Sequence, residues 1–160
     1  MRVIVWITEG TWPVGVDAAR SHAPDDADIV LLHVTPADVP GAAHGAFAGL
    51  LGRGHGERDP GTQLEHLAAA SADQLLAQAA QRLGRSCARV EREVVAAAGG
   101  ADLLVLARDG DRTHLGPRSL GPASRFIVDH APCPVLLVWP EPAPGIDTIP
   151  LPPPHPPHHR

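Results

Sequence analysis

The chain has 160 residues, a formal net charge of −5 and no lysine. This acidic balance excludes a nucleic acid as the main partner, because a phosphate backbone requires a concentrated basic face. Two cysteines are too few for a disulfide framework, and the seven histidines before the proline-rich tail lack the paired spacing of metal ligands, so neither a disulfide-bonded scaffold nor a metal site is predicted.

The sequence does not predict a signal peptide or a membrane span. Its N-terminus lacks a basic region followed by a long apolar stretch and a small-residue cleavage site. The longest apolar runs have the length of strands rather than of membrane-spanning helices. We therefore expect a soluble, cytoplasmic protein with no membrane partner.

The first part of the chain predicts alternating strands and helices. A strand is expected over residues 3–7, a helix over 14–21 and a second strand over 29–34. Residues 36–61 follow with few regular signals. Because this segment leaves the carboxyl end of a strand, it either closes over a ligand or forms a surface excursion.

The clearest helix lies between residues 64 and 83 and ends at Gly84. Its apolar and small residues recur at three- and four-residue steps, and we expect this stripe to lie on the sheet: Leu64, Leu67, Ala68, Ser71, Leu75, Ala79 and Leu83. Only residues 85–89 separate this helix from an apolar helical turn over 90–98. The third strand is therefore predicted to be shortened or missing.

The region before the proline-rich tail predicts a strand, a glycine-rich loop, a helix and a last strand. The apolar run 103–107 precedes Gly110, Gly116 and Gly121, and the run 135–138 ends the unit. This order is one βαβ unit of a parallel sheet, with the loop where a ligand would bind. Glycines allow backbone N–H groups to approach an anion, and the N-terminus of the next helix adds further donors.

The glycine loop is locally basic in an acidic chain. Its arginines are Arg108, Arg112, Arg118 and Arg125, and its acidic residues are Asp109 and Asp111. Ser119 and Ser124 lie in the same stretch. The arginines either contact an anion or are solvated beside glycines that merely permit a long turn, because glycine spacing alone is a weak signal.

The segments DLLVLA (102–107) and HAPCPVLLV (130–138), with the glycine loop between them, resemble the C-terminal half of a universal stress protein domain. The segment LLHV, which ends at Val34, fits the same family, and the resemblance covers roughly residues 1–140. It implies an α/β fold with an open parallel sheet of about four or five strands and helices on both faces, which is Rossmann-like and similar to the adenine nucleotide alpha hydrolases.

The loop departs from the family pattern G-x2-G-x9-G-[ST], which holds the phosphates of ATP in the members that bind it. Gly110 and Gly121 match the second and third glycines with one extra residue between them, whereas Ala107 replaces the first glycine. Pro122 replaces the Ser or Thr and offers neither a hydroxyl nor an N–H. Thr8 replaces the aspartate that ATP-binding members carry after the first strand.

The resemblance thus implies a set of nucleotide-binding residues, with Val34 beside the base and ATP with Mg²⁺ as the candidate ligand. The set is Thr8, Val34, Gly110, Arg112, Gly116, Arg118, Ser119, Gly121 and Ser124. No catalytic residues are predicted, because no nucleophile motif has a recognisable context.

Three functions are compatible with these features. The first is a non-enzymatic, stress-response regulatory module that binds ATP in a degenerate glycine loop. The second is a dimeric protein-interaction scaffold of the same fold that does not bind nucleotide, for which Thr8, Ala107 and Pro122 argue. The third is a slow nucleotide hydrolase in which Asp109, Asp111 and His114 position water.

The last strand and the tail complete the prediction. The resemblance implies a homodimer that pairs through Val135, Leu137 and Trp139, because family members often pair through the last strand, and no specific protein partner is indicated. Residues 1–140 are expected to form the domain. Residues 141–160, rich in proline and histidine, are expected to form a disordered tail.

Overall fold

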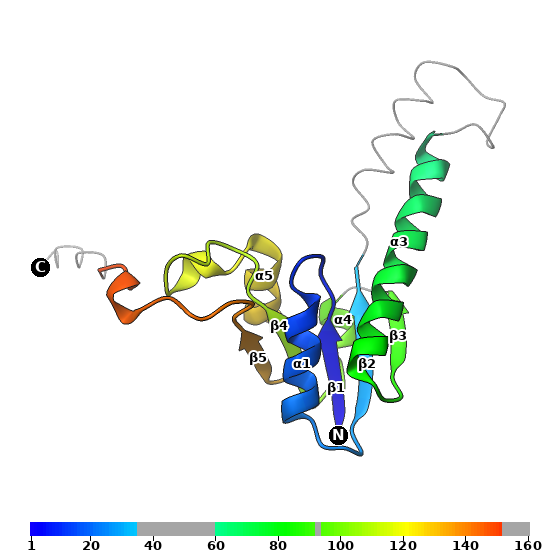
Figure 1. Ribbon diagram of the computed structural model, residues 1–160, viewed down its shortest axis with the longest axis horizontal. Coiled ribbons are helices and arrows are strands. Elements are labelled where there is room, and N and C mark those ends of the chain that lie inside the picture. The colour runs from blue at the N-terminus through cyan, green and yellow to red at the C-terminus, as the bar shows by residue number, and fades with distance from the viewer. Residues whose placement is uncertain (35–59, 92–93, 152–160) are drawn as a thin grey trace, which may run out of the picture.

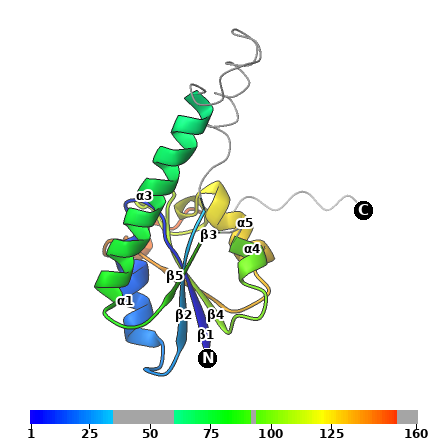
Figure 2. The same cartoon turned by 90° about the vertical axis from the view of Figure 1, so that its right-hand side faces the viewer.

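The computed structural model describes residues 1–34, 60–91 and 94–151. Five parallel strands form one sheet, and helices cover both of its faces (Figures 1 and 2). The predicted α/β fold is confirmed. The elements are β1 (Arg2–Trp6), α1 (Trp12–His22), β2 (Asp28–His33), α3 (Pro60–Leu83), β3 (Ala88–Glu91), α4 (Val94–Ala97), β4 (Leu103–Ala107), η2 (Pro117–Ser119), α5 (Pro122–His130), β5 (Val135–Val138) and η3 (Ile146–Thr148).

The sheet has the strand order β3-β2-β1-β4-β5, so β1 lies at its centre. Val5 pairs with Leu31 of β2 on one side and with Val105 of β4 on the other. The chain adds β2 and β3 on one side of β1 and then adds β4 and β5 on the other side, so the switch point lies between β1 and β4 in the sheet. Ligands of open parallel sheets bind at the carboxyl ends of the strands at such a switch point.

The alternation of side chains along β1 divides the core into two layers. Val3 and Val5 pack on the face covered by α1 and α3, whereas Ile4 and Trp6 pack on the face covered by α4 and α5. Figure 2 shows the two helix pairs on opposite sides of the sheet. Because both faces are covered, the strands are apolar at nearly every position.

The third strand is present but has only four residues. It pairs with β2 in the register Leu32↔Val90 and His33↔Glu91. The predicted start of the next helical turn at residue 90 is therefore wrong, since α4 begins at Val94. The open edge of β2 offers backbone partners to this stretch, and strand pairing overrides the helical pattern of its apolar residues.

Helix α3 extends well beyond the sheet (Figure 1). Its 24 residues span about 36 Å, whereas a five-residue strand spans about 17 Å. Leu64 and Leu67 are consequently 36% and 68% exposed, and the expectation that they lie on the sheet is wrong. The buried positions of the helix are Ala72, Leu76, Ala79 and Leu83, so only the last two members of the predicted stripe are buried.

The helix ends where the sequence predicts. Gly84 follows the last residue of α3 with φ +71°, and its N–H donates to the carbonyl of Ala80 at 3.1 Å. This is a left-handed C-terminal cap, which glycine adopts without a steric penalty. No helix in residues 1–34, 60–91 and 94–151 is both long and apolar enough to cross a lipid bilayer.

The chain beyond β5 returns to the glycine loop. The N–H of Leu115 donates to the hydroxyl of Thr148 at 3.1 Å, and Pro150 lies 3.7 Å from the position that a Cβ on Gly116 would take. The sequence predicts disorder from residue 141, whereas residues 146–148 form the 3-10 helix η3. Of the predicted loop over residues 36–61, residues 36–59 lie outside the described residues, and residues 60 and 61 belong to α3. Residues 152–160 of the predicted tail also lie outside the described residues.

Candidate ligand-binding site

An apolar pocket lies at the carboxyl ends of β1 and β2. Its volume is about 260 Å³. The end of the sheet supplies two side chains, α4 supplies two and the first turns of α5 supply four. The lining residues are Trp6, Val34, Val94, Val95, Pro122, Ala123, Phe126 and Ile127. We refer to this space as the apolar pocket.

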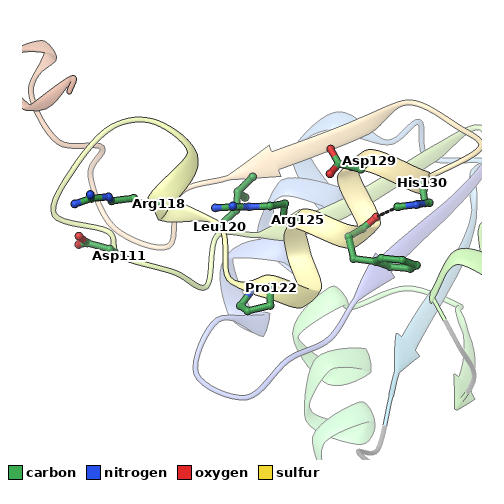
Figure 3. A pocket seen from close by; sticks show the side chains of 8 residues that line it. Asp111, Arg118, Leu120, Pro122, Arg125, Asp129 and His130 are labelled. Atoms are coloured by element: carbon green, nitrogen blue, oxygen red, sulfur yellow. Dashed lines mark hydrogen bonds between the residues drawn. The ribbon is translucent and has the colours of Figure 1, made fainter. Parts of the chain in front are cut away.

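A larger and more polar space adjoins it, with a volume of about 710 Å³ (Figure 3). Its lining residues are Asp111, Arg118, Leu120, Pro122, Arg125, Phe126, Asp129 and His130. We refer to this space as the charged hollow. Pro122 and Phe126 line both spaces, which therefore lie next to each other along α5.

Phe126 is the shared wall. It is 51% exposed, and its ring stacks on that of His130 with the centroids 4.1 Å apart. The His130 ring is held in turn by a 2.8 Å hydrogen bond between Nδ1 and the carbonyl of Phe126. An exposed aromatic ring fixed in this way presents a flat surface on which a planar ligand can stack.

The glycine loop closes on itself between β4 and α5. The N–H of Gly110 donates to the carbonyl of Ser119 at 3.0 Å, and the N–H of Asp111 donates to the carbonyl of Arg118 at 2.8 Å. A Cβ on Gly110 would lie 2.5 Å from the Arg118 carbonyl oxygen. Only glycine therefore permits this close approach of two backbone segments.

Ser119 is buried inside the loop, and its hydroxyl is used there. It donates to the carbonyl of Gly116 at 2.7 Å and accepts a hydrogen bond from Nη1 of Arg108. The guanidinium of Arg108 also lies 4.6 Å from the centroid of the Trp139 ring, which is a cation–π contact. These contacts join the loop to the end of β5 rather than presenting the two side chains to a ligand.

The first turn of α5 carries a carboxylate supplied by the loop. The N–H of Gly121 donates to Oδ1 of Asp109 at 2.8 Å. A Cβ on Gly121 would lie only 2.8 Å from Oδ2 of the same carboxylate. Helix N-termini attract negative charge, and here an acidic side chain of the protein itself occupies that position.

The remaining loop arginines differ in their contacts. Nη2 of Arg125 donates to the carbonyl of Pro117 at 2.8 Å, and Nη1 of Arg112 lies 3.4 Å from the carboxylate of Glu141. Arg118 lines the charged hollow beside Asp111 (Figure 3). The hydroxyl and the backbone N–H of Thr113 donate to Asp111 and lower the pKa of its carboxyl, so this wall of the hollow stays negative at neutral pH.

Thr8 serves the turn between β1 and α1. Its hydroxyl is hydrogen-bonded to that of Thr11 at 2.7 Å, and its carbonyl accepts from the N–H of Trp12 at 3.0 Å. It is not among the described residues that line either space. Ser124 is fully buried, and its hydroxyl has no hydrogen-bond partner among the described residues.

The other seven predicted site residues are divided between three places. Val34 lies in the apolar pocket and Arg118 in the charged hollow, whereas Gly110, Arg112, Gly116, Ser119 and Gly121 build or brace the loop. The sequence analysis missed the rest of the apolar pocket. The spacing of Ala123, Phe126 and Ile127 on one face of the helix is the signal that could have found part of it.

The sequence matches the universal stress protein family over residues 16–138. The chain belongs to the universal stress protein family. The match ends at the last residue of β5 and includes the loop and α5. No curated protein matches the sequence at a significant level.

Solved structures, universal stress proteins among them, have the same fold as this member. The hypothetical protein MJ0577 is 15% identical, with 89% of this chain and 97% of the other covered and a TM-score of 0.66. The universal stress protein UspA from Lactobacillus plantarum is 18% identical, with 86% and 97% covered and a TM-score of 0.56. A universal stress protein solved in complex with cAMP is 16% identical, with 88% and 98% covered and a TM-score of 0.52.

Within the described ranges of this universal stress protein, no group of three or more His, Cys, Asp or Glu side chains is arranged to hold a metal ion. The two loop glycines that the resemblance matches to the family are those with the closest surroundings. Gly110 faces backbone and Gly121 faces the Asp109 carboxylate. The loop of this member is therefore closed by its own atoms.

Proposed function

We propose that this universal stress protein is a cytoplasmic, non-enzymatic stress-response regulator that binds an adenine compound at the carboxyl edge of its sheet. The apolar pocket is the observation that carries the proposal. It lies beside the switch point between β1 and β4, at the start of α5. The universal stress protein solved with cAMP supports a ligand of this class.

The size and lining of the apolar pocket fit the base rather than the whole ligand. Its volume of about 260 Å³ lies below the roughly 300–1,000 Å³ of sites that enclose an entire small molecule. Trp6 and Phe126 supply aromatic surface, and Val34 supplies an aliphatic edge. A planar heteroaromatic ring fits such walls by burying apolar area and by stacking.

The charged hollow fits the polar remainder of the ligand. Arg118 and Arg125 can contact anionic or hydroxyl oxygens, while Asp111 and Asp129 can accept hydrogen bonds from ribose hydroxyls. The mixture of signs favours a sugar with limited negative charge over a cluster of phosphates. ATP with Mg²⁺ remains a ligand to test against smaller adenine compounds.

The contacts of the loop support a non-enzymatic role. Asp109 accepts from Gly121, and Asp111 accepts from Thr113 and lies 3.3 Å from Nδ1 of His114. The groups that could position water for hydrolysis are therefore engaged in holding the loop. These contacts fix the orientation of both carboxylates, and a residue that activates water must be oriented toward the reacting group.

A homodimeric scaffold is the second candidate, and the edge position of β5 favours it. Within the described sheet, β5 pairs only with β4. An apolar edge strand is a template for pairing with another chain. We propose that two copies pair along this edge, and the ligand test decides whether the dimer is also a nucleotide sensor.

Calorimetric titration with adenosine, cAMP and Mg²⁺-ATP tests the proposed function. We expect at least one of them to bind with a Kd on the order of micromolar. Ala123→Leu fills the apolar pocket and should abolish this binding, whereas Ala77→Leu on the exposed side of α3 should leave it unchanged. The proposal is contradicted if none of the three compounds binds and the freshly purified protein carries no adenine compound.

A further inference from the structure

We infer that Asp109 is a built-in carboxylate ligand of the α5 N-terminus and that it makes the site select adenine compounds without a phosphate chain, such as adenosine, over ATP. The inference rests on the proposed function and adds the residue that sets ligand class. It concerns the charge at one end of the ligand rather than the recognition of the base.

The first step is the geometry of the carboxylate. Asp109 and Gly121 are the two ends of the glycine loop, and Oδ1 accepts the Gly121 N–H at 2.8 Å. The carboxylate also covers the Cα of Gly121, because an added Cβ would lie 2.8 to 3.0 Å from Oδ2, Cγ and Oδ1. A phosphate that sought the same N–H would collide with this side chain.

The second step is the number of donors that remain. Pro122 follows Gly121 as the first residue of α5 and has no N–H. The first two backbone positions at the helix terminus thus offer nothing to a phosphate, since one is occupied and the other lacks a donor. The N–H groups of Ala123 and Ser124 are the donors that remain at this terminus. The Asp109 carboxylate at Gly121 offsets part of the partial positive charge of the helix.

Three of the loop arginines already have partners within the protein. Arg108 donates to Ser119 and lies over Trp139, Arg125 donates to the carbonyl of Pro117, and Arg112 lies next to Glu141. These contacts direct the three guanidinium groups to partners other than Asp109, which has no ion-pair partner among the described residues, so a phosphate brought beside it meets an unpaired negative charge. The fourth arginine of the loop, Arg118, lines the charged hollow. Like charges at a short distance repel most strongly where water is partly excluded.

The position of Pro122 connects this arrangement with the ligand. Pro122 lines both the apolar pocket and the charged hollow, and Gly121 precedes it directly. A base in the apolar pocket places its substituent near this end of α5. A neutral ribose can donate hydroxyl hydrogens to carboxylates there, whereas a triphosphate cannot.

The test compares adenosine with Mg²⁺-ATP in calorimetric titrations of the full chain and of Asp109→Asn. Asn keeps an oxygen acceptor for the Gly121 N–H and removes the charge. We expect the wild-type protein to bind adenosine more tightly than ATP, and Asp109→Asn to improve ATP affinity about tenfold while adenosine changes less than about twofold. Asp73→Asn on α3 makes the same change in net charge away from the loop and should leave the ratio unchanged.

A second variant, Asp109→Ser, removes the charge without introducing a side-chain amide that could form new hydrogen bonds in the loop. The backbone amide resonance of Gly121 reports whether the loop is intact. The inference is overturned if the wild-type protein binds ATP at least as tightly as adenosine and both variants leave that ratio unchanged. The proposed function survives that result. If neither compound binds to any of the proteins, the proposed function fails and takes the inference with it.

Discussion

The backbone N–H of Gly121 donates a 2.8 Å hydrogen bond to the carboxylate of Asp109 across the base of the glycine loop. The pair connects the end of β4 with the start of α5, the two elements between which a ligand of this fold binds. The loop is therefore not an open cradle of N–H groups. In this universal stress protein a carboxylate of the chain itself occupies the N-terminus of α5, where the fold could otherwise bind an anion.

Gly110→Ala tests the close packing that this closure requires. The new Cβ would lie 2.5 Å from the carbonyl oxygen of Arg118, and neither backbone segment can move without breaking loop hydrogen bonds. We expect the free energy of unfolding to fall by about 1–3 kcal/mol in urea titrations. Gly99→Ala is the matched control, because its Cβ would only reach a contact of 3.4 Å, and an equal loss in both variants would contradict the argument.

The C-terminal segment should hold the outer part of the loop. Thr148→Val removes the hydroxyl that accepts the N–H of Leu115. We expect faster hydrogen exchange at the Leu115 amide, because this N–H then loses its acceptor. Thr148→Ser retains the hydroxyl and should exchange like the wild-type protein. Unchanged exchange in Thr148→Val would mean that the segment does not brace the loop in solution.

The pair Asp17–Arg82 should add a pH-dependent contribution to the attachment of α3 to α1. Two hydrogen bonds of 2.9 and 2.6 Å from the Arg82 guanidinium lower the pKa of the Asp17 carboxyl. A carboxyl whose pKa is lower in the folded state stabilises the fold above the ordinary Asp pKa of about 3.9, and the contribution is lost as the pH falls through the lowered value.

Asp17→Asn should therefore be slightly less stable than the wild-type protein at neutral pH. The effect is small because both side chains are nearly half exposed. We expect the difference in urea midpoint to shrink with decreasing pH and with added salt. A difference that is independent of both would assign the loss to packing. Asp73→Asn serves as the control for net charge on α3.

The proposed homodimer can be tested through the backbone of β5. The N–H groups of Leu104 and Arg108 donate to the carbonyls of Pro134 and Val138, so the backbone groups of Leu137 point away from β4. Leu137→Pro removes an outward N–H and should give a monomer in sedimentation experiments. Leu137→Ala loses the same side chain but keeps the N–H, and it should remain a dimer.

A Leu137→Pro protein that keeps its dimeric mass and its circular dichroism spectrum would show that β5 is not the interface. A charge at Val138 gives a weaker test, because that side chain packs on the core face shared with α1. Val138→Asp could then change the mass through a loss of folding. The backbone variants separate these two effects.

The sheet could be predicted from the sequence because its strands are short apolar runs that alternate with helices. The runs at 103–107 and 135–138 match β4 and β5 residue for residue. The start of β3 could not be located, because Val90 fits a strand and a helix equally well. Only the pairing of this stretch with the edge of β2 determines that it forms a strand. The exposure of the first half of α3 could not be predicted either, because the periodicity of its apolar residues does not show how far the sheet extends beneath the helix.

The site could be predicted only in its location. The strand–loop–helix order places the loop correctly, and Val34 lies in the apolar pocket. The contact between Asp109 and Gly121 could not be predicted, because it depends on how the residues between them fold. Val94 and Val95 join the pocket through the packing of α4 against the sheet, which no spacing along the chain encodes.

The most direct test of the account is a titration of the ¹⁵N-labelled protein with adenosine, followed by amide chemical shifts. We expect saturable shifts at the amides of Val34, Val94, Ala123 and Phe126, because these residues line the apolar pocket. Shifts confined to other parts of the chain, or no shifts with adenosine, cAMP or Mg²⁺-ATP, would contradict the proposal that the protein binds an adenine compound at the carboxyl edge of its sheet.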